Sequence, residues 1–326
     1  MLKILNALVA VFGGVAGALL VYYVFNKLVE RLPDKWEARL KPYVFIGPAF
    51  LVIGLFLVYP AVRTVVLSFG DATSSQFVGM ANYSEILASP EFRGLLFNNF
   101  LWIAIVPAVT VAIGLLVAVL ADRLTTRAEN IAKSVIFLPM AISFVGAATI
   151  WRFVYEARAE GQAQIGLLNA ITTKLGFDPV SWLQYSRFNL NDLLLMIILV
   201  WMQAGFAMVL LSAAIKGVPD DTLEAARIDG ASELQIFFKV VVPQIWPTVI
   251  TVFITIVILV MKIFDVIYVM TGGNFGTDVI GNRFFKELFT FGNNGRAAAL
   301  VVILLLAVIP VMIYQVRQFR VQESQR

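Results

Sequence analysis

The sequence predicts an all-α, polytopic membrane protein, and three observations support this fold class. Of the 326 residues, 60% are hydrophobic and only 14% are charged, whereas about a quarter of the residues in soluble domains are charged. Apolar runs of the roughly 20 residues that a helix needs to cross the hydrocarbon core recur along the chain. Several of the 22 glycines and 12 prolines lie inside these runs, as is common in membrane helices. The composition therefore indicates a bundle of transmembrane helices.

Seven apolar runs are long enough to span a membrane. The first could also be a signal peptide, but it has no small-residue cleavage site and a charged segment follows it at once. We therefore expect it to be retained as an extra N-terminal helix. The expected spans cover residues 4–25, 43–68, 97–121, 132–154, 192–215, 244–270 and 297–316.

Positive charge predicts the orientation of the spans. More than half of the 25 lysines and arginines lie in the segments 26–42, 122–133, 216–243 and 317–326. Loops rich in lysine and arginine remain in the cytoplasm. We therefore expect the N-terminus outside and the C-terminus in the cytoplasm, which an odd number of spans requires.

The segment 26–42 follows the extra helix and carries Leu28, Leu32, Trp36 and Leu40 at helical spacing between charged residues. This pattern predicts an amphipathic helix on the inner membrane surface. A plain charged linker is an equal alternative. The expected organisation is thus an extra helix and linker over 1–42, followed by a core of six spans over 43–326.

The residue types and motifs that the chain lacks exclude several classes of function. The chain has no cysteine and no histidine, so thiol chemistry and histidine-based metal or hydrolytic sites are excluded. It also lacks the glycine-rich P-loop motif that binds ATP phosphates. The net charge of +4 comes from loop residues and does not indicate nucleic-acid binding. We expect a chain that is not itself an enzyme and binds no cofactor.

One polar stretch, PDDTLEAARIDGASELQIFFKVVVP (219–243), interrupts two apolar spans. Asp221 and Glu224 have the spacing of a capping box, and Ser232 and Gln235 have the spacing of a second one. Gly230 between them would permit the left-handed conformation that ends a helix. The pattern predicts two short helices with a stiff turn, suited to docking on another protein. A loop that only connects two spans is the alternative.

The same stretch resembles the EAA loop of ABC-importer permeases. The resemblance rests on Glu224-Ala225-Ala226, followed by Gly230 after three residues and by Pro243. The family ends this motif with I-x-L-P, whereas this chain has Val-Val-Val-Pro, a conservative departure. The resemblance implies that the loop 217–243 is a coupling loop. Its implied contact residues are Glu224, Ala225, Ala226, Asp229, Gly230 and Pro243.

Other segments resemble the maltose-type, binding-protein-dependent sugar permeases, including FLPMAIS (137–143) and FDVIYVMTGG (264–273). The extra first span and LVERLPDKWEARLKPYVFIGP are most similar to the alpha-glucoside branch. The resemblance covers nearly the whole chain. It implies a type I ABC importer transmembrane domain, with one extra N-terminal helix, in a bacterial inner membrane.

That resemblance also implies partners. Such a permease would pair with a second, homologous permease and stand on two cytoplasmic ATPase subunits, which would bind ATP and Mg²⁺. A solute-binding protein would dock on the outer loops 69–96, 156–191 and 271–296 and release sugar. The sugar would be an alpha-glucoside or a related glucosyl solute, with glycerol phosphate a more distant option.

Three expected spans carry residues suited to a sugar, because sugar sites combine aromatic faces with hydrogen-bonding side chains. A glutamine inside an apolar helix must face a partner or water, and Pro139 is placed to loosen the fourth span. Each feature also fits ordinary helix packing. The candidates are Met140, Ser143 and Phe144 in the fourth span, Trp201, Gln203 and Phe206 in the fifth, and Lys262 and Asp265 in the sixth.

The sixth-span pair is the most unusual of these candidates. Lys262 and Asp265 are three residues apart and would share one helical face near the outer surface. Charged residues within spans are functional candidates, although a self-satisfied pair or a lysine reaching the interface is the alternative.

The resemblance also weakens the case for a sugar site in this chain. The sixth-span positions at which maltose permease holds sugar fall here on Ile256, Val260 and Ile263. Either a different face with Thr255, Lys262 and Asp265 binds sugar, or the sister permease carries the site. A secondary transporter or channel for a polar solute is the alternative function.

Overall fold

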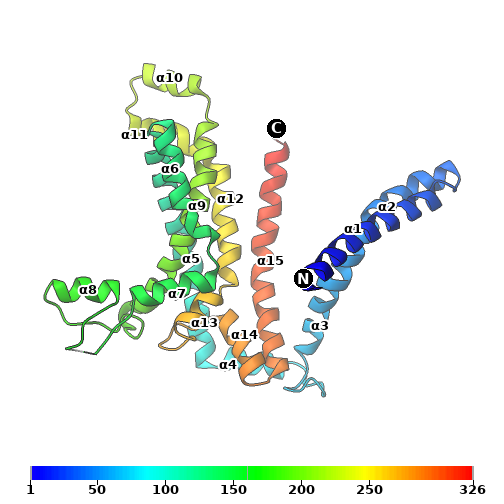
Figure 1. Cartoon of the computed structure of the whole chain (residues 1–326), viewed down its shortest axis with the longest axis horizontal. Helices are drawn as coiled ribbons and strands as arrows, with labels where there is room; N and C mark the ends of the chain where they lie inside the picture. Colours follow the sequence, from blue (N-terminus) through cyan, green and yellow to red (C-terminus); the bar gives the residue numbers. More distant parts are fainter. Residues whose placement is uncertain (1, 160, 325–326) are drawn as a thin grey trace. The chain divides into compact units, whose positions relative to one another are not determined.

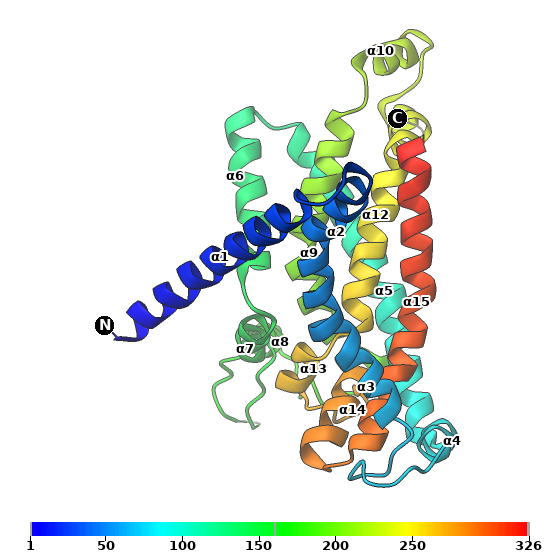
Figure 2. The same cartoon turned by 90° about the vertical axis from the view of Figure 1, so that its right-hand side faces the viewer.

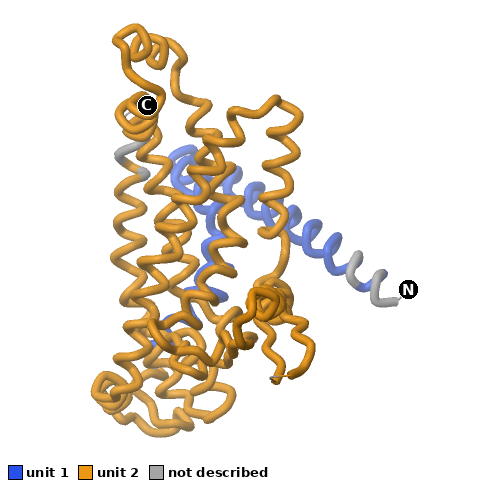
Figure 3. Tube along the Cα trace, turned by 90° about the vertical axis from the view of Figure 1, so that its left-hand side faces the viewer, with its two compact units in different colours: residues 1–66 blue, residues 67–326 orange. Residues whose placement is uncertain are grey.

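The computed structural model describes residues 2–159 and 161–324, and helices dominate them. The described residues contain no β-strand, only an isolated bridge between Gly70 and Phe77. The chain divides into two compact units, Met1–Val66 and Leu67–Arg326 (Figure 3). Within the described residues, six helical segments are long and apolar enough to cross a membrane, or seven if one bent pair counts as a span. The prediction of an all-α membrane protein with about seven spans is therefore confirmed.

Unit 1 is a helical hairpin in which α1 (Leu2–Val29) packs on α2 (Asp34–Ile53). The hydroxyl of Tyr22 donates to the carbonyl of Phe45 at 3.0 Å, and their rings stack. A π-helical segment, Gly54–Val58, joins α2 to α3 (Tyr59–Leu67).

The predicted surface helix over 26–42 does not form a separate element. Its first residues end α1 and its last residues begin α2. Pro33 disfavours a helical conformation at the residue before it, so the chain turns there. Asp34 and Glu37 then lie in the first turn of α2, where negative charge favours the helix N-terminus.

A π-helical segment precedes a proline at two places. Gly54–Val58 comes before Pro60, and Phe237–Val241 comes before Pro243. A proline ring clashes with the carbonyl four residues earlier in an α-helix. The wider π turn relieves that clash, so both helices continue through their prolines.

Unit 2 is built on four long helices that lie side by side, α5, α9, α12 and α15 (Figure 2). The short helices α4, α13 and α14 lie at one end, and α10 lies beyond the other end (Figure 1). The elements are α4 (Ala81–Ala88), α5 (Pro90–Asp122), α6 (Thr126–Phe137), α7 (Phe144–Val154), α8 (Leu167–Lys174), α9 (Leu190–Lys216), α10 (Asp220–Ile228), α11 (Glu233–Ile236), α12 (Val242–Met261), α13 (Asp265–Met270), α14 (Ile280–Phe285) and α15 (Asn294–Ser324).

Helix α9 forms the centre of this unit, because residues around most of its circumference are buried. Leu195, Leu199 and Met208 are among its fully buried side chains. Gly205 allows a close backbone approach: a Cβ atom there would lie 2.5 Å from the carbonyl oxygen of Ile136. The absence of a side chain at Gly205 thus brings α9 against the end of α6.

Two predicted spans are broken rather than straight. The span predicted over 132–154 bends by 102° between α6 and α7. Pro139 lies in a 3₁₀ turn there, and Ser143 caps α7 by accepting a hydrogen bond from the amide of Gly146 at 3.1 Å. The span predicted over 244–270 ends at Met261, and a separate helix, α13, begins at Asp265.

The segment 156–191 follows α7, and its described part forms a small packed cap around Asn169. The Asn169 side chain is fully buried. Its Nδ2 donates to the carbonyls of Glu156 and Val180, and its Oδ1 accepts from the amide of Val180 and from Trp182 Nε1. This single amide holds three chain segments together.

Candidate functional site

The predicted coupling loop consists of α10 and α11 at one end of unit 2, opposite the cap helix α8 (Figure 1). The first predicted capping box is wrong. Pro219 occupies the position before the helix, and no side chain caps it. Because α10 begins at Asp220, Asp221 is already inside the helix. The two aspartates still place negative charge in the first turn, where it suits the helix dipole.

The turn and the second cap are confirmed. Gly230 has a φ of +80°, and the amide of Ala231 donates to the carbonyl of Ala226 at 3.1 Å. This is a left-handed helix ending that favours glycine. Ser232 and Gln235 then form a reciprocal capping box: the Ser232 amide donates to Gln235 Oε1 at 2.8 Å, and Ser232 Oγ accepts from the Gln235 amide at 3.4 Å.

An ion pair spans the same turn. The Nε of Arg227 lies 3.0 Å from Oε1 of Glu233. The hydrogen bond that Arg227 donates to Glu233 raises the pKa of Arg227 above its usual value. Both side chains are exposed, so the pair adds little stability by itself, but it joins α10 to α11 across Gly230.

Exposure divides the coupling-loop residues into two groups. Ala226 is half-buried, as is the neighbouring Leu223, and both pack against the core of unit 2. Glu224, Ala225, Asp229, Gly230 and Pro243 are exposed. Ile228 is 85% exposed, which is unusual for a branched aliphatic side chain. The loop therefore packs against the helix bundle through Leu223 and Ala226, and its opposite face exposes both polar residues and Ile228.

An ionic cluster centred on the buried carboxylate of Glu129 lies where α5 and α9 end and α6 begins, beside this loop. Glu129 on α6 is only 6% exposed, and its Oε1 accepts from Lys216 at 2.6 Å and from Lys133. Lys216 also lies 3.5 Å from Asp122, and Lys133 donates to Ser212. From the sequence, Lys133 and Lys216 were interpreted only as basic residues of the loops that set the orientation. Glu129 and Lys133 form a local i,i+4 pair, but no local pattern marks the contact of Glu129 with Lys216, because these two are 87 residues apart.

At membrane depth the structure has a groove of about 680 Å³ between α5, α6, α7 and α9. Trp201 is the one predicted substrate residue that lines it, and its ring packs edge-on against Trp151 with 5.7 Å between centroids. Every lining side chain is apolar apart from the indole nitrogens of the two tryptophans: Ile105, Val109, Ile113, Val135, Ile136, Pro139, Trp151, Leu193, Met196, Ile197, Val200, Trp201 and Ala204.

The remaining candidates are scattered. Met140 is exposed beside the bend of the fourth span, and Phe144 and Phe206 pack partly buried against the core. Ser143 is used as a helix cap. Gln203 is 6% exposed, and its side-chain amide makes no hydrogen bond with any described group.

Lys262 and Asp265 do not share one helix. Lys262 is exposed at the end of α12, and half-buried Asp265 starts α13 after an irregular break. Among the described residues, no ion pair joins the two. The helical spacing predicted for them is therefore wrong, because the span ends between them.

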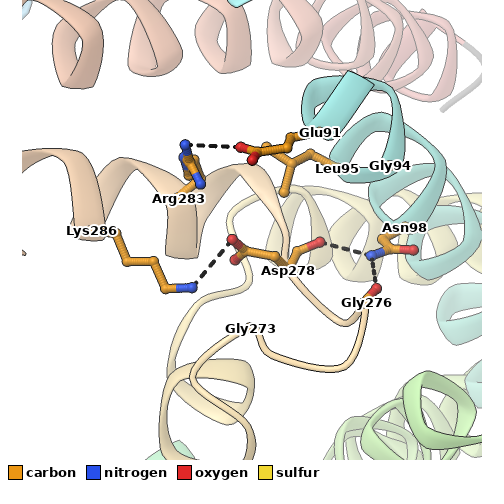
Figure 4. Close-up of a pocket in the computed structure, with 9 residues that line it drawn as sticks. All are labelled: Glu91, Gly94, Leu95, Asn98, Gly273, Gly276, Asp278, Arg283 and Lys286. Carbon is orange, nitrogen blue, oxygen red and sulfur yellow. Dashed lines mark hydrogen bonds and ion pairs between the residues drawn. The ribbon is translucent and has the colours of Figure 1, made fainter. Parts of the chain in front are cut away.

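At the end opposite the coupling loop, the segment 271–279 is held by asparagines from two long helices. Asn98 on α5 donates to the carbonyls of Gly276 and Asp278 at 2.6 and 2.9 Å (Figure 4). Asn191 on α9 donates to the carbonyl of Phe275 at 2.8 Å. Both asparagines are buried, so their amides fix the backbone of this segment.

The cavity in Figure 4 has a volume of about 370 Å³, and its charges are paired within the chain. Arg283 lies 3.1 Å from Glu91, and Lys286 lies 3.4 Å from Asp278. These pairs leave few groups to recognise a ligand, and the Glu91–Arg283 pair instead joins α5 to α14.

Comparison with known proteins agrees with this architecture. Residues 110–320 match the family model described as "Binding-protein-dependent transport system inner membrane component". The chain is 49% identical over 279 residues to the alpha-glucoside transport system permease protein AglF of Rhizobium meliloti (strain 1021), covering 85% of this chain and 82% of AglF. It is 49% identical over 283 residues to the osmoprotective compounds uptake permease protein GgtC of Synechocystis sp., covering 87% of this chain and 100% of GgtC.

Among solved structures, a chain of a bacterial ABC transporter involved in alginate import superposes with a TM-score of 0.76. The match covers 88% of this chain and 99% of that chain at 18% sequence identity, and so it establishes a shared fold. The family model covers most of the core, and the two relatives cover more than four-fifths of the chain. The protein therefore belongs to the family of inner-membrane permease components of binding-protein-dependent ABC transport systems.

Proposed function

We propose that this chain is the permease subunit of an ATP-driven importer for an alpha-glucoside or a related glucosyl solute. The observation that carries the proposal is the coupling loop. Two short helices, a glycine-specific turn and a reciprocal cap make it stiff, and its exposed face is free to dock on an ATPase. A stiff connection suits this role, because force must pass without melting the element that transmits it.

In this scheme the coupling loop lies in the cytoplasm, with the N-terminus outside and the C-terminus inside. The charge bias of the loops supports that orientation. Two separate ATPase subunits would bind ATP and Mg²⁺. Glu224, Ala225 and Asp229 would face one of them, while Gly230 sets the angle between α10 and α11.

The outer segments would receive a solute-binding protein, and a second, homologous permease would complete the pathway. The apolar groove at membrane depth supports an unequal contribution of the two permeases to sugar binding. A sugar needs hydrogen-bonding partners, and those lining residues supply almost none. We therefore place the membrane-depth sugar contacts mainly in the sister chain, with Trp201 as the contribution of this one.

The glucosyl substrate is proposed from the two relatives, which take up alpha-glucosides and osmoprotective compounds according to their names. The two broken spans are a feature that the secondary-transporter alternative predicts. The coupling loop and the family both favour the ABC importer, since a secondary transporter binds no ATPase and needs no surface for one.

The proposal is tested by reconstitution. The chain is coexpressed with a sister permease, an ATPase and a solute-binding protein from the same organism, purified as a complex and placed in proteoliposomes with ATP on the ATPase side. We expect uptake of one or more radiolabelled sugars from a panel of sucrose, maltose, trehalose and glucosylglycerol. Uptake that does not require ATP, or purification of this chain without an ATPase subunit, would show that the proposal is wrong.

A further inference from the structure

A second polar cavity lies at the end of unit 2 opposite the coupling loop and has a volume of about 630 Å³. It lies between the end of α7, the cap segment 181–184 and the segment 271–279 that the two buried asparagines hold. Cavities of roughly 300–1,000 Å³ accommodate small organic ligands. The size therefore fits a disaccharide.

Two aromatic side chains with open faces line this cavity. Phe153 is 63% exposed and Phe275 is 48% exposed. Trp182 adds a third ring, whose Nε1 is already bonded to Asn169. Removing an exposed aromatic face from water is favourable in free energy. The apolar C–H face of a pyranose ring can pack on such a face.

Hydrogen-bonding groups in the same cavity are unused. Across residues 2–159 and 161–324, no ion pair or side-chain hydrogen bond uses the guanidinium of Arg152, the hydroxyl of Ser181 or the amide of Gln184. The cavity of Figure 4 is different, because its arginine and lysine are already paired. Glu156 also lines the cavity and balances the charge of Arg152. Three donors without a partner among the described residues, beside two open rings, therefore suit a neutral, hydroxyl-rich ligand.

The backbone holds one of these rings in a strained conformation. Phe275 has a φ of +58°, which is unfavourable for a bulky side chain. The buried amides of Asn191 and Asn98 bond the carbonyls of Phe275 and Gly276 and maintain it. Strain that two helices jointly maintain is typical of functional sites. The neighbouring positions 272, 273 and 276 are glycines, so the bulky residue at 275 is the exception.

From these observations we infer that this cavity is an outer sugar-binding site. A pyranose ring packs on Phe275 and Phe153, and its hydroxyls bond to Arg152, Ser181 and Gln184. The inference rests on the proposed function and extends it: sugar leaving the binding protein contacts this site before it reaches the membrane-depth path. The site is shallow and open, so the expected affinity is millimolar, about −4 kcal/mol.

The test measures direct sugar contact on the whole complex, in lipid nanodiscs that contain no alkyl glycoside detergent and no binding protein. Saturation-transfer NMR is recorded with maltose and with methyl alpha-glucoside as probes. We expect a signal that weakens about tenfold in Phe275→Ala, because an aromatic contact is lost. Gln184→Ala and Arg152→Gln should weaken it as well, whereas Phe275→Trp should retain it. The matched control is Phe177→Ala, an aromatic residue 68% exposed and outside this cavity, which should change nothing.

The outcomes separate this inference from the proposed function. If proteoliposomes import no glucoside, the proposed function fails. If import is normal but Phe275→Ala, Gln184→Ala and Arg152→Gln all leave the maltose signal unchanged, the outer site is refuted and the importer stands. If these variants instead raise only the KM for the binding protein, the cavity receives a segment of that protein, and the sugar site is again refuted.

Discussion

The Nζ of Lys216, the last residue of α9, lies 2.6 Å from Oε1 of the buried carboxylate of Glu129 on α6. Three residues later, Pro219 leads into α10 of the coupling loop. Farther along the same two helices, Gly205 lies against the backbone of Ile136 and Phe137. Helices α6 and α9 are thus joined twice, so a displacement of the coupling loop reaches the bent fourth span through both contacts.

We first predict that Lys216→Met and Glu129→Gln reduce sugar uptake per ATP hydrolysed by at least about fivefold, the size of a weak coupling free energy. Loss of either charge releases α6 from the coupling loop and leaves the ATPase intact. Uptake and phosphate release are measured on the same proteoliposomes. The control is Lys41→Met, which removes a partly buried i,i+4 ion pair with Glu37 in unit 1; because this pair lies outside α6, α9 and the coupling loop, coupling should be unchanged. Full coupling in both Glu129→Gln and Lys216→Met would rule out this linkage.

Substitution of Gly230 should uncouple transport without blocking membrane insertion. No atom lies within 4 Å of a Cβ built at Gly230, so Gly230→Ala acts through the backbone alone and strains the turn by about 1 kcal/mol. Gly230→Pro is more severe, because proline fixes φ near −65°. Membrane levels are measured by immunoblot, together with ATPase activity and uptake.

The matched control is Gly176→Ala, at a second glycine with positive φ and open space, located in the cap around Asn169 at the opposite end of unit 2. It introduces the same kind of strain far from the coupling loop, so uptake should be unchanged. If Gly230→Pro transports normally, the docking role of the loop is wrong. Equal loss in both alanine variants would indicate general destabilisation instead.

Gly205→Ala should destabilise the protein. The added Cβ would lie 2.5 Å from the carbonyl oxygen of Ile136 and 2.7 Å from the Cα of Phe137. Backbone atoms cannot rotate aside, so α9 must move away, at a cost of about 1–3 kcal/mol. Thermal unfolding in detergent followed by fluorescence-detected size exclusion measures the change. Gly94→Ala on α5, where nothing lies within 4 Å, should be neutral or slightly stabilising, and an unchanged melting temperature in Gly205→Ala would contradict the close contact.

Gln203→Ala and Lys262→Ala, made separately, test whether the fifth and sixth spans contact sugar in this chain. Gln203 is buried without a hydrogen-bond partner among the described groups, and Lys262 is exposed at the end of α12. If they line the path, each substitution raises the KM for uptake, because a hydrogen bond to the sugar is lost. Unchanged uptake in both variants would assign the membrane-depth site to the sister permease.

Much of the fold was predictable, because it depends on local patterns. Hydropathy located every long span, and the capping box of Ser232 and Gln235 and the left-handed Gly230 followed from spacing over a few residues. The first capping box was predicted wrongly for a local reason: Pro219 took the position before the helix that Asp221 was expected to hold. Pro139 indicated that the fourth span is loosened, and the chain bends by 102° just after it. The break at Lys262 was not predicted, because the apolar residues on both sides of Lys262 and Asp265 resemble one continuous span.

The sequence alone determined that this is a polytopic helical membrane protein with a rigid polar loop between its fifth and sixth predicted spans, since membrane solvation and helix capping act over short stretches of chain. Only the tertiary structure decided which residues from distant segments contact one another. Glu129 with Lys216, Gly205 with Ile136, and Asn191 with Phe275 are each separated by more than 65 residues. Such contacts arise only when distant helices pack, because packing rather than local preference brings their side chains within bonding distance.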